Sequence, residues 1–142
     1  MQRRLYFAYG SNMDETQMLE ERCPGAILSE VAKLPGYRFL INTHGVATII
    51  PNPESDVYGA LWSITPDDEE SLDRYEGVKH GHYRRDELDV ESETETRPAL
   101  VYIATNDTPG SPSGTYMKLI IDAAIQRGLP EKYLRELRLW KS

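Results

Sequence analysis

The chain has 142 residues, of which 39% are hydrophobic and 27% charged, a composition typical of a globular protein. Its length suits one domain over residues 1–142, and a domain of this size buries enough apolar surface to fold without disulfides or metals. The formal net charge of −7 disfavours anionic partners, so we expect binding to neither nucleic acid nor a membrane surface.

The acidic excess is concentrated in one segment. Residues 67–95 hold 12 acidic and four basic residues, whereas the rest of the chain is nearly balanced. The single cysteine, Cys23, excludes an internal disulfide and a multi-cysteine metal site. No apolar run approaches the roughly 18 residues of a membrane helix, and the apolar stretch after the basic start is too short for a signal peptide. We therefore expect a cytoplasmic protein.

The first predicted elements surround a short polar turn. An apolar and aromatic run at residues 5–9 predicts a buried strand, and the Gly-Ser-Asn sequence at 10–12 ends it. A helix is expected over residues 14–22, with Asn12 or Asp14 as its N-cap. The Cys-Pro-Gly sequence that follows ends this helix.

The middle of the chain has the pattern of strands. Four strands, separated by proline, glycine and asparagine signals, are predicted at residues 26–34, 37–42, 46–50 and 57–64. A helix is then expected over residues 66–76. Thr65 is its cap, Pro66 occupies the first helical position, acids follow in the first turn, and Gly77 ends it.

The last third of the chain predicts two strands and one or two helices. The strands are expected at residues 83–91 and 98–105. The Ser-Pro-Ser sequence at 111–113 starts a helix that Gly128 ends, and a short helix follows at 130–137. Six or seven strands with two or three helices predict an α+β domain on a strongly curved or closed sheet.

The turn after the first strand is the first candidate site. A glycine followed by small polar residues, between a strand and a helix, presents several backbone N–H groups that suit a carboxylate or a developing oxyanion. An ordinary capped turn explains the same spacing. Ser11 is a poor acyl nucleophile, because it lacks a glycine-flanked elbow and a nearby base.

Glu76 is the second candidate. On the predicted helix it lies about 40° from Leu72, on the apolar stripe, whereas Asp73 is expected to point away. A carboxylate in this position, with Gly77 beside it, is expected to have a raised pKa, as a general base working near neutrality needs. The alternative is a glutamate that bends out to solvent at a frayed helix end.

The remaining candidates have weaker signals. His80 and His82 would bind a metal only with a third ligand, and a solvated loop is the preferred interpretation of their glycine-rich turn. Tyr102 and Tyr116 either supply hydroxyl groups to a pocket or pack in the core. Residues 106–114, just before Tyr116, are a candidate lid.

Two blocks of sequence are specific in combination: YFAYGSNM at residues 6–13 and LDRYEGVKHGHY at residues 72–83. A third block, VYGALW at 57–62, and shorter pieces at 116–118 and 128–130 accompany them. Together they resemble the signatures of the γ-glutamylcyclotransferase family of the AIG2-like superfamily. The resemblance spans nearly the whole chain and is greatest to the branch that acts on γ-glutamyl amino acids.

The resemblance implies a small mixed β-barrel with packed helices and an enzyme that forms 5-oxoproline. In that family the α-amine of a γ-glutamyl group attacks its own γ-carbonyl, which releases 5-oxoproline and an amino acid or amine. Glu76 matches the family's general base. The matching substrate-binding residues are Tyr9, Gly10, Ser11, Asn12 and Tyr116. The implied partner is a small γ-glutamyl compound, and neither a metal nor an organic cofactor is implied.

Two other functions stay open. The chain is alternatively a non-enzymatic module that binds a small molecule on the same fold, or an enzyme that removes a γ-glutamyl protecting group in a biosynthetic pathway. The sequence predicts neither the preferred leaving group nor the oligomeric state.

Overall fold

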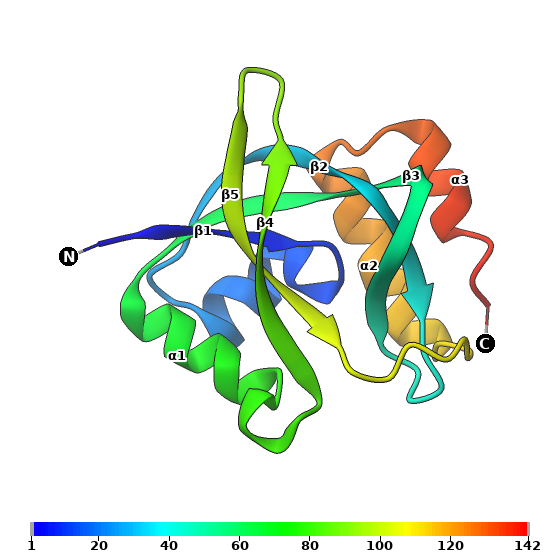
Figure 1. Cartoon of the computed structure of the whole chain (residues 1–142), viewed down its shortest axis with the longest axis horizontal. Coiled ribbons are helices and arrows are strands. Elements are labelled where there is room, and N and C mark those ends of the chain that lie inside the picture. Colours follow the sequence, from blue (N-terminus) through cyan, green and yellow to red (C-terminus); the bar gives the residue numbers. More distant parts are fainter. Residues whose placement is uncertain (1, 142) are drawn as a thin grey trace.

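The computed structural model describes residues 2–141, and its centre is a closed barrel of five strands in the order β1-β3-β2-β4-β5. The strands are β1 (Arg4–Ala8), β2 (Ile27–Ile41), β3 (Ala47–Ile64), β4 (Tyr83–Glu91) and β5 (Thr96–Ala104). All neighbours pair antiparallel except β1 and β5, which pair in parallel where Tyr6 lies beside Leu100. In Figure 1, β1 runs behind the β4–β5 hairpin. The expected small mixed barrel is confirmed.

The expected count of six or seven strands is wrong, because two pairs of predicted strands are continuous. Residues 26–34 and 37–42 join in β2, and residues 46–50 and 57–64 join in β3. Pro35 and Gly36 shift the register of the β2–β3 ladder without interrupting it. Gly36 has a φ of +82°, which glycine adopts without strain, so a bulge forms where the sequence pattern predicted a break.

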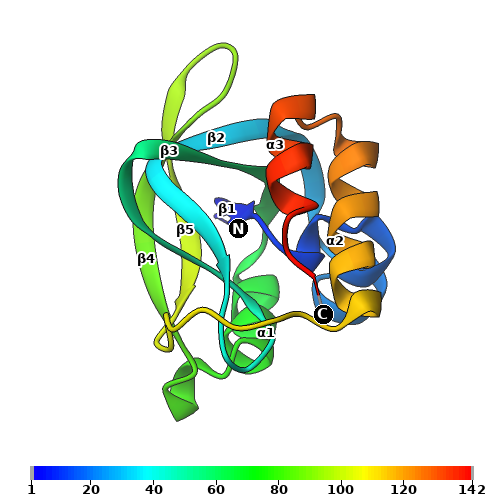
Figure 2. The same cartoon turned by 90° about the vertical axis from the view of Figure 1, so that its right-hand side faces the viewer.

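Three α-helices and three short helical turns pack around the barrel. They are α1 (Pro66–Tyr75), α2 (Gly114–Arg127), α3 (Glu131–Leu137), η1 (Ser11–Met13), η2 (Gln17–Arg22) and η3 (Val78–His80). Figure 2 shows α2 and α3 side by side against the barrel, with α1 at its lower end. Among residues 2–141, no helix combines the length and the apolar character needed to cross a membrane.

The helix expected over residues 14–22 forms with a different hydrogen-bond pattern. Its last part, η2, is a π-helix, in which the N–H of Cys23 donates to the carbonyl of Met18 at 2.7 Å. Of the two candidate caps, Asp14 is the one used, since its carboxylate accepts from the N–H of Gln17 at 2.9 Å.

The core fills the barrel and the space beneath the helices. Phe7, Leu61 and Trp62 are fully buried within it. The indole N–H of Trp62 also donates to the carbonyl of Asn12 at 3.1 Å. This bond attaches the turn after β1 to the core.

Thr65 and Asp68 form a reciprocal capping box at the start of α1. The N–H of Asp68 donates to the Thr65 hydroxyl at 3.1 Å, and the N–H of Thr65 donates to the Asp68 carboxylate at 3.0 Å. We expect Thr65→Ala to lower the free energy of unfolding by about 1 kcal/mol, measured by urea denaturation. Thr108→Ala, at an exposed threonine, is the control, and an equal change in both variants would contradict the role of the cap.

Candidate active site

A cavity of about 210 Å³ lies between the turn after β1 and the C-terminal end of α1. It brings together all six residues singled out from the sequence: Tyr9, Gly10, Ser11, Asn12, Glu76 and Tyr116. These residues come from three separate parts of the chain. The barrel and the start of α2 therefore assemble a site that no single segment contains.

Glu76 is the residue that directly follows α1, and it lines this cavity. Its N–H still donates to the carbonyl of Leu72 at 2.8 Å, and Gly77, with a φ of +63°, then turns the chain away. Burial raises the pKa of the half-buried Glu76 carboxyl to about 7. The position of Glu76 beside the apolar stripe of α1 predicted that its pKa would be raised.

Arg22 is the cation that faces Glu76. It lies at the end of η2, lines the same cavity, and stacks its guanidinium 4.0 Å from the centroid of the Tyr75 ring. Its positive charge lowers the pKa of Glu76 and so opposes the larger effect of burial. Arg22 is a site residue that the sequence did not predict; the available signal was an arginine in the last turn before the Cys-Pro-Gly sequence that ends the helix.

The turn after β1 presents its backbone to the cavity. In η1 the carbonyls of Gly10 and Ser11 accept from residues 13 and 14, which leaves the first-turn N–H groups outside the helical hydrogen bonds. The Ser11 hydroxyl accepts from the amide of Gln17 at 2.7 Å, and the Asn12 amide donates to the Tyr6 hydroxyl at 3.0 Å. These side chains fix the turn, and the N–H groups are the donors available to an anion.

Tyrosines form much of the cavity wall. Six of the nine in the chain line it: Tyr6, Tyr9, Tyr75, Tyr83, Tyr102 and Tyr116. The Tyr83 hydroxyl donates to the carbonyl of Ala47 at 2.7 Å, and the Tyr116 hydroxyl accepts from the N–H of Ala47 at 3.0 Å. Burial raises the pKa of Tyr116 to about 12, so this hydroxyl stays neutral near pH 7. Within the described part of the chain, the charged residues that line this cavity are Glu76 and Arg22.

Comparison with known proteins identifies the family of this chain. The model of the AIG2-like family matches residues 56–137. The gamma-glutamylcyclotransferase of Mus musculus is 34% identical over 145 residues, covering 94% of this chain and 77% of that protein, and the Homo sapiens protein matches with the same figures. The chain belongs to the gamma-glutamylcyclotransferase family. The family inferred from the blocks at residues 6–13 and 72–83 is thereby confirmed.

A solved structure supports the assignment at the level of the fold. A gamma-glutamyl cyclotransferase superposes with a TM-score of 0.91 at 32% identity, covering 99% of this chain and 89% of that one. The match extends over both the barrel and the helices around it. The fold of this gamma-glutamylcyclotransferase family member is therefore that of its relatives.

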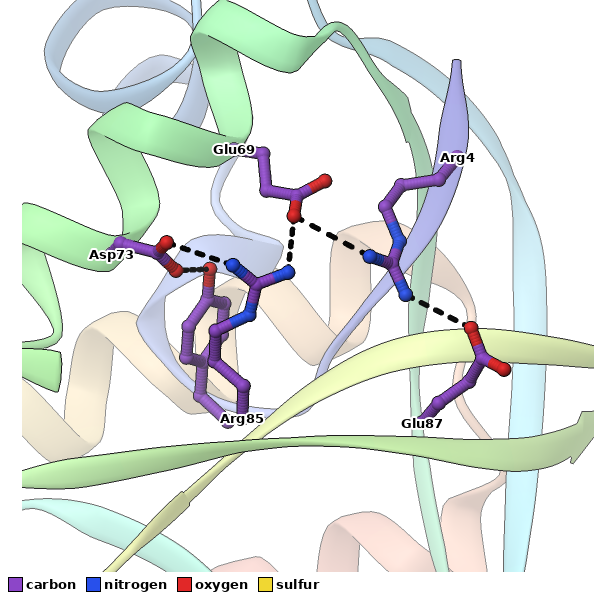
Figure 3. A network of polar contacts seen from close by, with 6 residues as sticks. Arg4, Glu69, Asp73, Arg85 and Glu87 are labelled. Atoms are coloured by element: carbon purple, nitrogen blue, oxygen red, sulfur yellow. Dashed lines mark hydrogen bonds and ion pairs between the residues drawn. The ribbon is translucent and has the colours of Figure 1, made fainter. Parts of the chain in front are cut away.

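In this family member an ion-pair network supports the cavity wall from outside. Figure 3 shows the five charged side chains that join α1 to β1 and β4: Arg4, Glu69, Asp73, Arg85 and Glu87. The Tyr102 hydroxyl donates to Asp73 at 2.7 Å, and Arg85 donates to the other carboxylate oxygen at 2.8 Å. The expectation that Asp73 points away is wrong, because these two groups draw it toward the barrel.

The segment at residues 106–114, considered as a lid, lies against the end of β2. The N–H of Gly110 donates to the carbonyl of Ile41 at 2.8 Å, and Asn42 pairs with Pro109. The Asn42 amide also donates to the carbonyl of Asn106 at 3.0 Å. In this structure residues 106, 109 and 110 of the segment are therefore held against the end of β2, and the segment leads directly into α2.

Proposed function

We propose that the protein cyclises γ-glutamyl compounds, releasing 5-oxoproline and an amino acid or amine. The observation that carries the proposal is the position of Glu76. A carboxyl with a pKa near 7 shares a small cavity with the N–H groups of the turn at residues 10–12. Family membership supports the same activity, since the curated relatives are gamma-glutamylcyclotransferases.

In the proposed reaction Glu76 acts first as a base and then as an acid. The α-amino group of the substrate is an ammonium at neutral pH, and Glu76 takes its proton. The free amine attacks the γ-carbonyl carbon, which forms the ring C–N bond and places negative charge on the carbonyl oxygen. Protonated Glu76 then donates to the leaving nitrogen as the original C–N bond breaks and the carbonyl re-forms. The Glu76 carboxylate regenerated in this way takes the second proton of the ring nitrogen, which leaves the neutral lactam of 5-oxoproline, and passes that proton to the released amine.

The turn after β1 has the complementary role in this proposal. The N–H groups of Gly10, Ser11 and Asn12 stabilise the oxyanion, and Tyr9 and Tyr116 shape the wall against which the substrate folds. The nucleophile and the electrophile belong to one molecule, so a correct pose supplies a large rate advantage, equivalent to about 10⁵ M or more. The proposed steps need no metal or organic cofactor. The proposed partner is a small cytoplasmic metabolite, without nucleic acid or membrane.

Release of 5-oxoproline from a set of γ-glutamyl compounds tests this function. The set contains γ-glutamyl-alanine, a γ-glutamyl amine and glutathione, and the product is quantified by chromatography. We expect release from at least the γ-glutamyl amino acid. Saturable binding without release would favour a binding module, and release only from larger γ-glutamylated products would favour a deprotecting enzyme.

The pH dependence of activity gives a separate prediction. Glu76 accepts a proton only when ionised, so kcat/KM is expected to rise with pH through a midpoint near the Glu76 pKa of about 7. Arg22→Gln removes the charge that lowers this pKa, and the midpoint is expected to move to higher pH. Arg138→Gln, on an exposed arginine beyond α3, is the control. An unchanged midpoint in Arg22→Gln would contradict the coupling between the two side chains.

A further inference from the structure

A second cavity, of about 410 Å³, adjoins the first one. The two share four lining residues: Val46, Tyr75, Glu76 and Tyr83. Glu76 therefore lies at the boundary between them. The turn at residues 10–12 lines the first cavity only, so a γ-carbonyl held by that turn would extend its other substituent toward the second cavity.

Imidazole and guanidinium side chains outnumber carboxylates in the lining of the second cavity, although the chain as a whole is acidic. All three histidines of the chain, His44, His80 and His82, line it together with Arg74. Among the described residues Glu76 is the one acid that lines either cavity, although the chain has 23 acidic residues. Four imidazole or guanidinium side chains against a single carboxylate favour an anionic ligand.

These donors are held by ordered loops. The buried Asn42 accepts from the N–H of His44 at 3.0 Å, which fixes the turn between β2 and β3. The His82 ring packs directly on Gly77, where a Cβ atom would lie only 2.6 Å from the ring. The Thr105 hydroxyl donates to the carbonyl of Gly81 at 2.7 Å and so ties this loop to the end of β5.

A metal is a poor occupant for the histidine cluster. Within residues 2–141, no three His, Cys, Asp or Glu side chains are arranged to hold a metal ion. The three imidazoles come from two segments, His44 from the turn between β2 and β3, and His80 and His82 from the segment between α1 and β4. They are suited to donate hydrogen bonds to separate groups of one elongated anion.

We propose that the second cavity binds the leaving group and selects amino acids with an acidic side chain. This inference rests on the proposed function. The leaving amino acid brings its α-carboxylate, and the cavity has more cationic and imidazole donors than one carboxylate uses. Arg74, His80 and His82 are thus available to a second carboxylate on the leaving amino acid. The second cavity is also about twice as large as the first, so it accommodates a long acidic side chain.

The test compares γ-glutamyl-glutamate with γ-glutamyl-glutamine, which have nearly the same shape and differ by one charge. At low ionic strength we expect kcat/KM of the wild-type protein to be about fivefold higher for the glutamate compound, mainly through KM. In the triple variant Arg74→Gln/His80→Gln/His82→Gln the ratio is expected to fall to about 1. Lys79→Gln is the matched control. Lys79 is a cation in η3, directly before His80, but it does not line the cavity.

The outcomes separate this inference from the proposed function. Equal kcat/KM for the two dipeptides, or a preference that survives in the triple variant, overturns the inference while 5-oxoproline release upholds the cyclisation. Turnover of γ-glutamyl-alanine by the triple variant verifies that its fold and base are intact. Absence of 5-oxoproline from all three compounds with the wild-type protein would overturn both.

Discussion

Glu76→Gln is expected to lower kcat for 5-oxoproline release by about a thousandfold, within the range for loss of a general acid–base group. Glutamine matches glutamate in shape, but its amide cannot take the proton of the substrate ammonium. The measurement is the steady-state rate with γ-glutamyl-alanine. Glu70→Gln, on an exposed position of α1, is the control and is expected to keep wild-type activity. Wild-type turnover in Glu76→Gln would refute the role proposed for Glu76.

The same substitution is expected to stabilise the fold above pH 7. Burial raises the Glu76 pKa from 4.5 to about 7, so the unfolded chain releases this proton at lower pH than the folded chain does. Between those values the folded state binds more protons, and the stability contributed by this carboxyl falls as pH rises. After allowance for partial exposure, the glutamine variant gains about 2 kcal/mol at pH 8, and the gain disappears below pH 4.5. Urea denaturation at pH 4.5 and pH 8 measures this gain in stability. A variant less stable than the wild-type protein at pH 8 would contradict the unfavourable ionisation assigned to the half-buried Glu76 carboxyl.

Gly59→Ala is expected to lower the free energy of unfolding by about 3 kcal/mol. A Cβ atom at this position would lie 2.3 Å from the carbonyl oxygen of Ala8 and 3.0 Å from the Phe7 ring. Relief of the clash requires β1 to separate from β3, which also displaces the turn that follows β1. The glycine of the VYGALW block thus has a steric explanation.

Gly36→Ala provides the comparison for this prediction. Gly36 has a positive φ but open space around its Cα, so alanine there meets only backbone strain of about 1 kcal/mol. Denaturant unfolding of both variants separates the two effects. Equal losses would show that β1 moves away from β3 at little energetic cost.

Local sequence signals were sufficient for the features that depend on near neighbours. Helical periodicity placed Glu76 beside the apolar stripe of α1, and the Gly-Ser-Asn sequence marked the turn that presents N–H groups. Capping rules predicted the start of α1 at Thr65, where the capping box forms. Each of these features depends on residues within about one helical turn.

The remaining features depend on contacts between distant segments. Arg22 reaches the cavity through a π-helix, whose wider turn a 3.6-residue periodicity does not describe. The second cavity needs loops from residues 42–46, 77–82 and 104–106 to meet, and a histidine within a short polar loop gives no signal of such a meeting. Pro35 and Gly36 are strong local breakers, but pairing with β3 overrides them.

The parallel pairing of β1 with β5 has a consequence for biosynthesis. The chain makes β1 and the turn at residues 10–12 first, yet one edge of β1 has no partner until Thr96–Ala104 has been synthesised. Glu76 is likewise made before the strand that closes the barrel around it. A ribosome-bound chain therefore carries every predicted site residue except Tyr116 before it has a closed barrel to hold them. Pairing with β3 can hold the other edge of β1 earlier, but the barrel closes only when β5 arrives, and such distant closure is typical of slow folding.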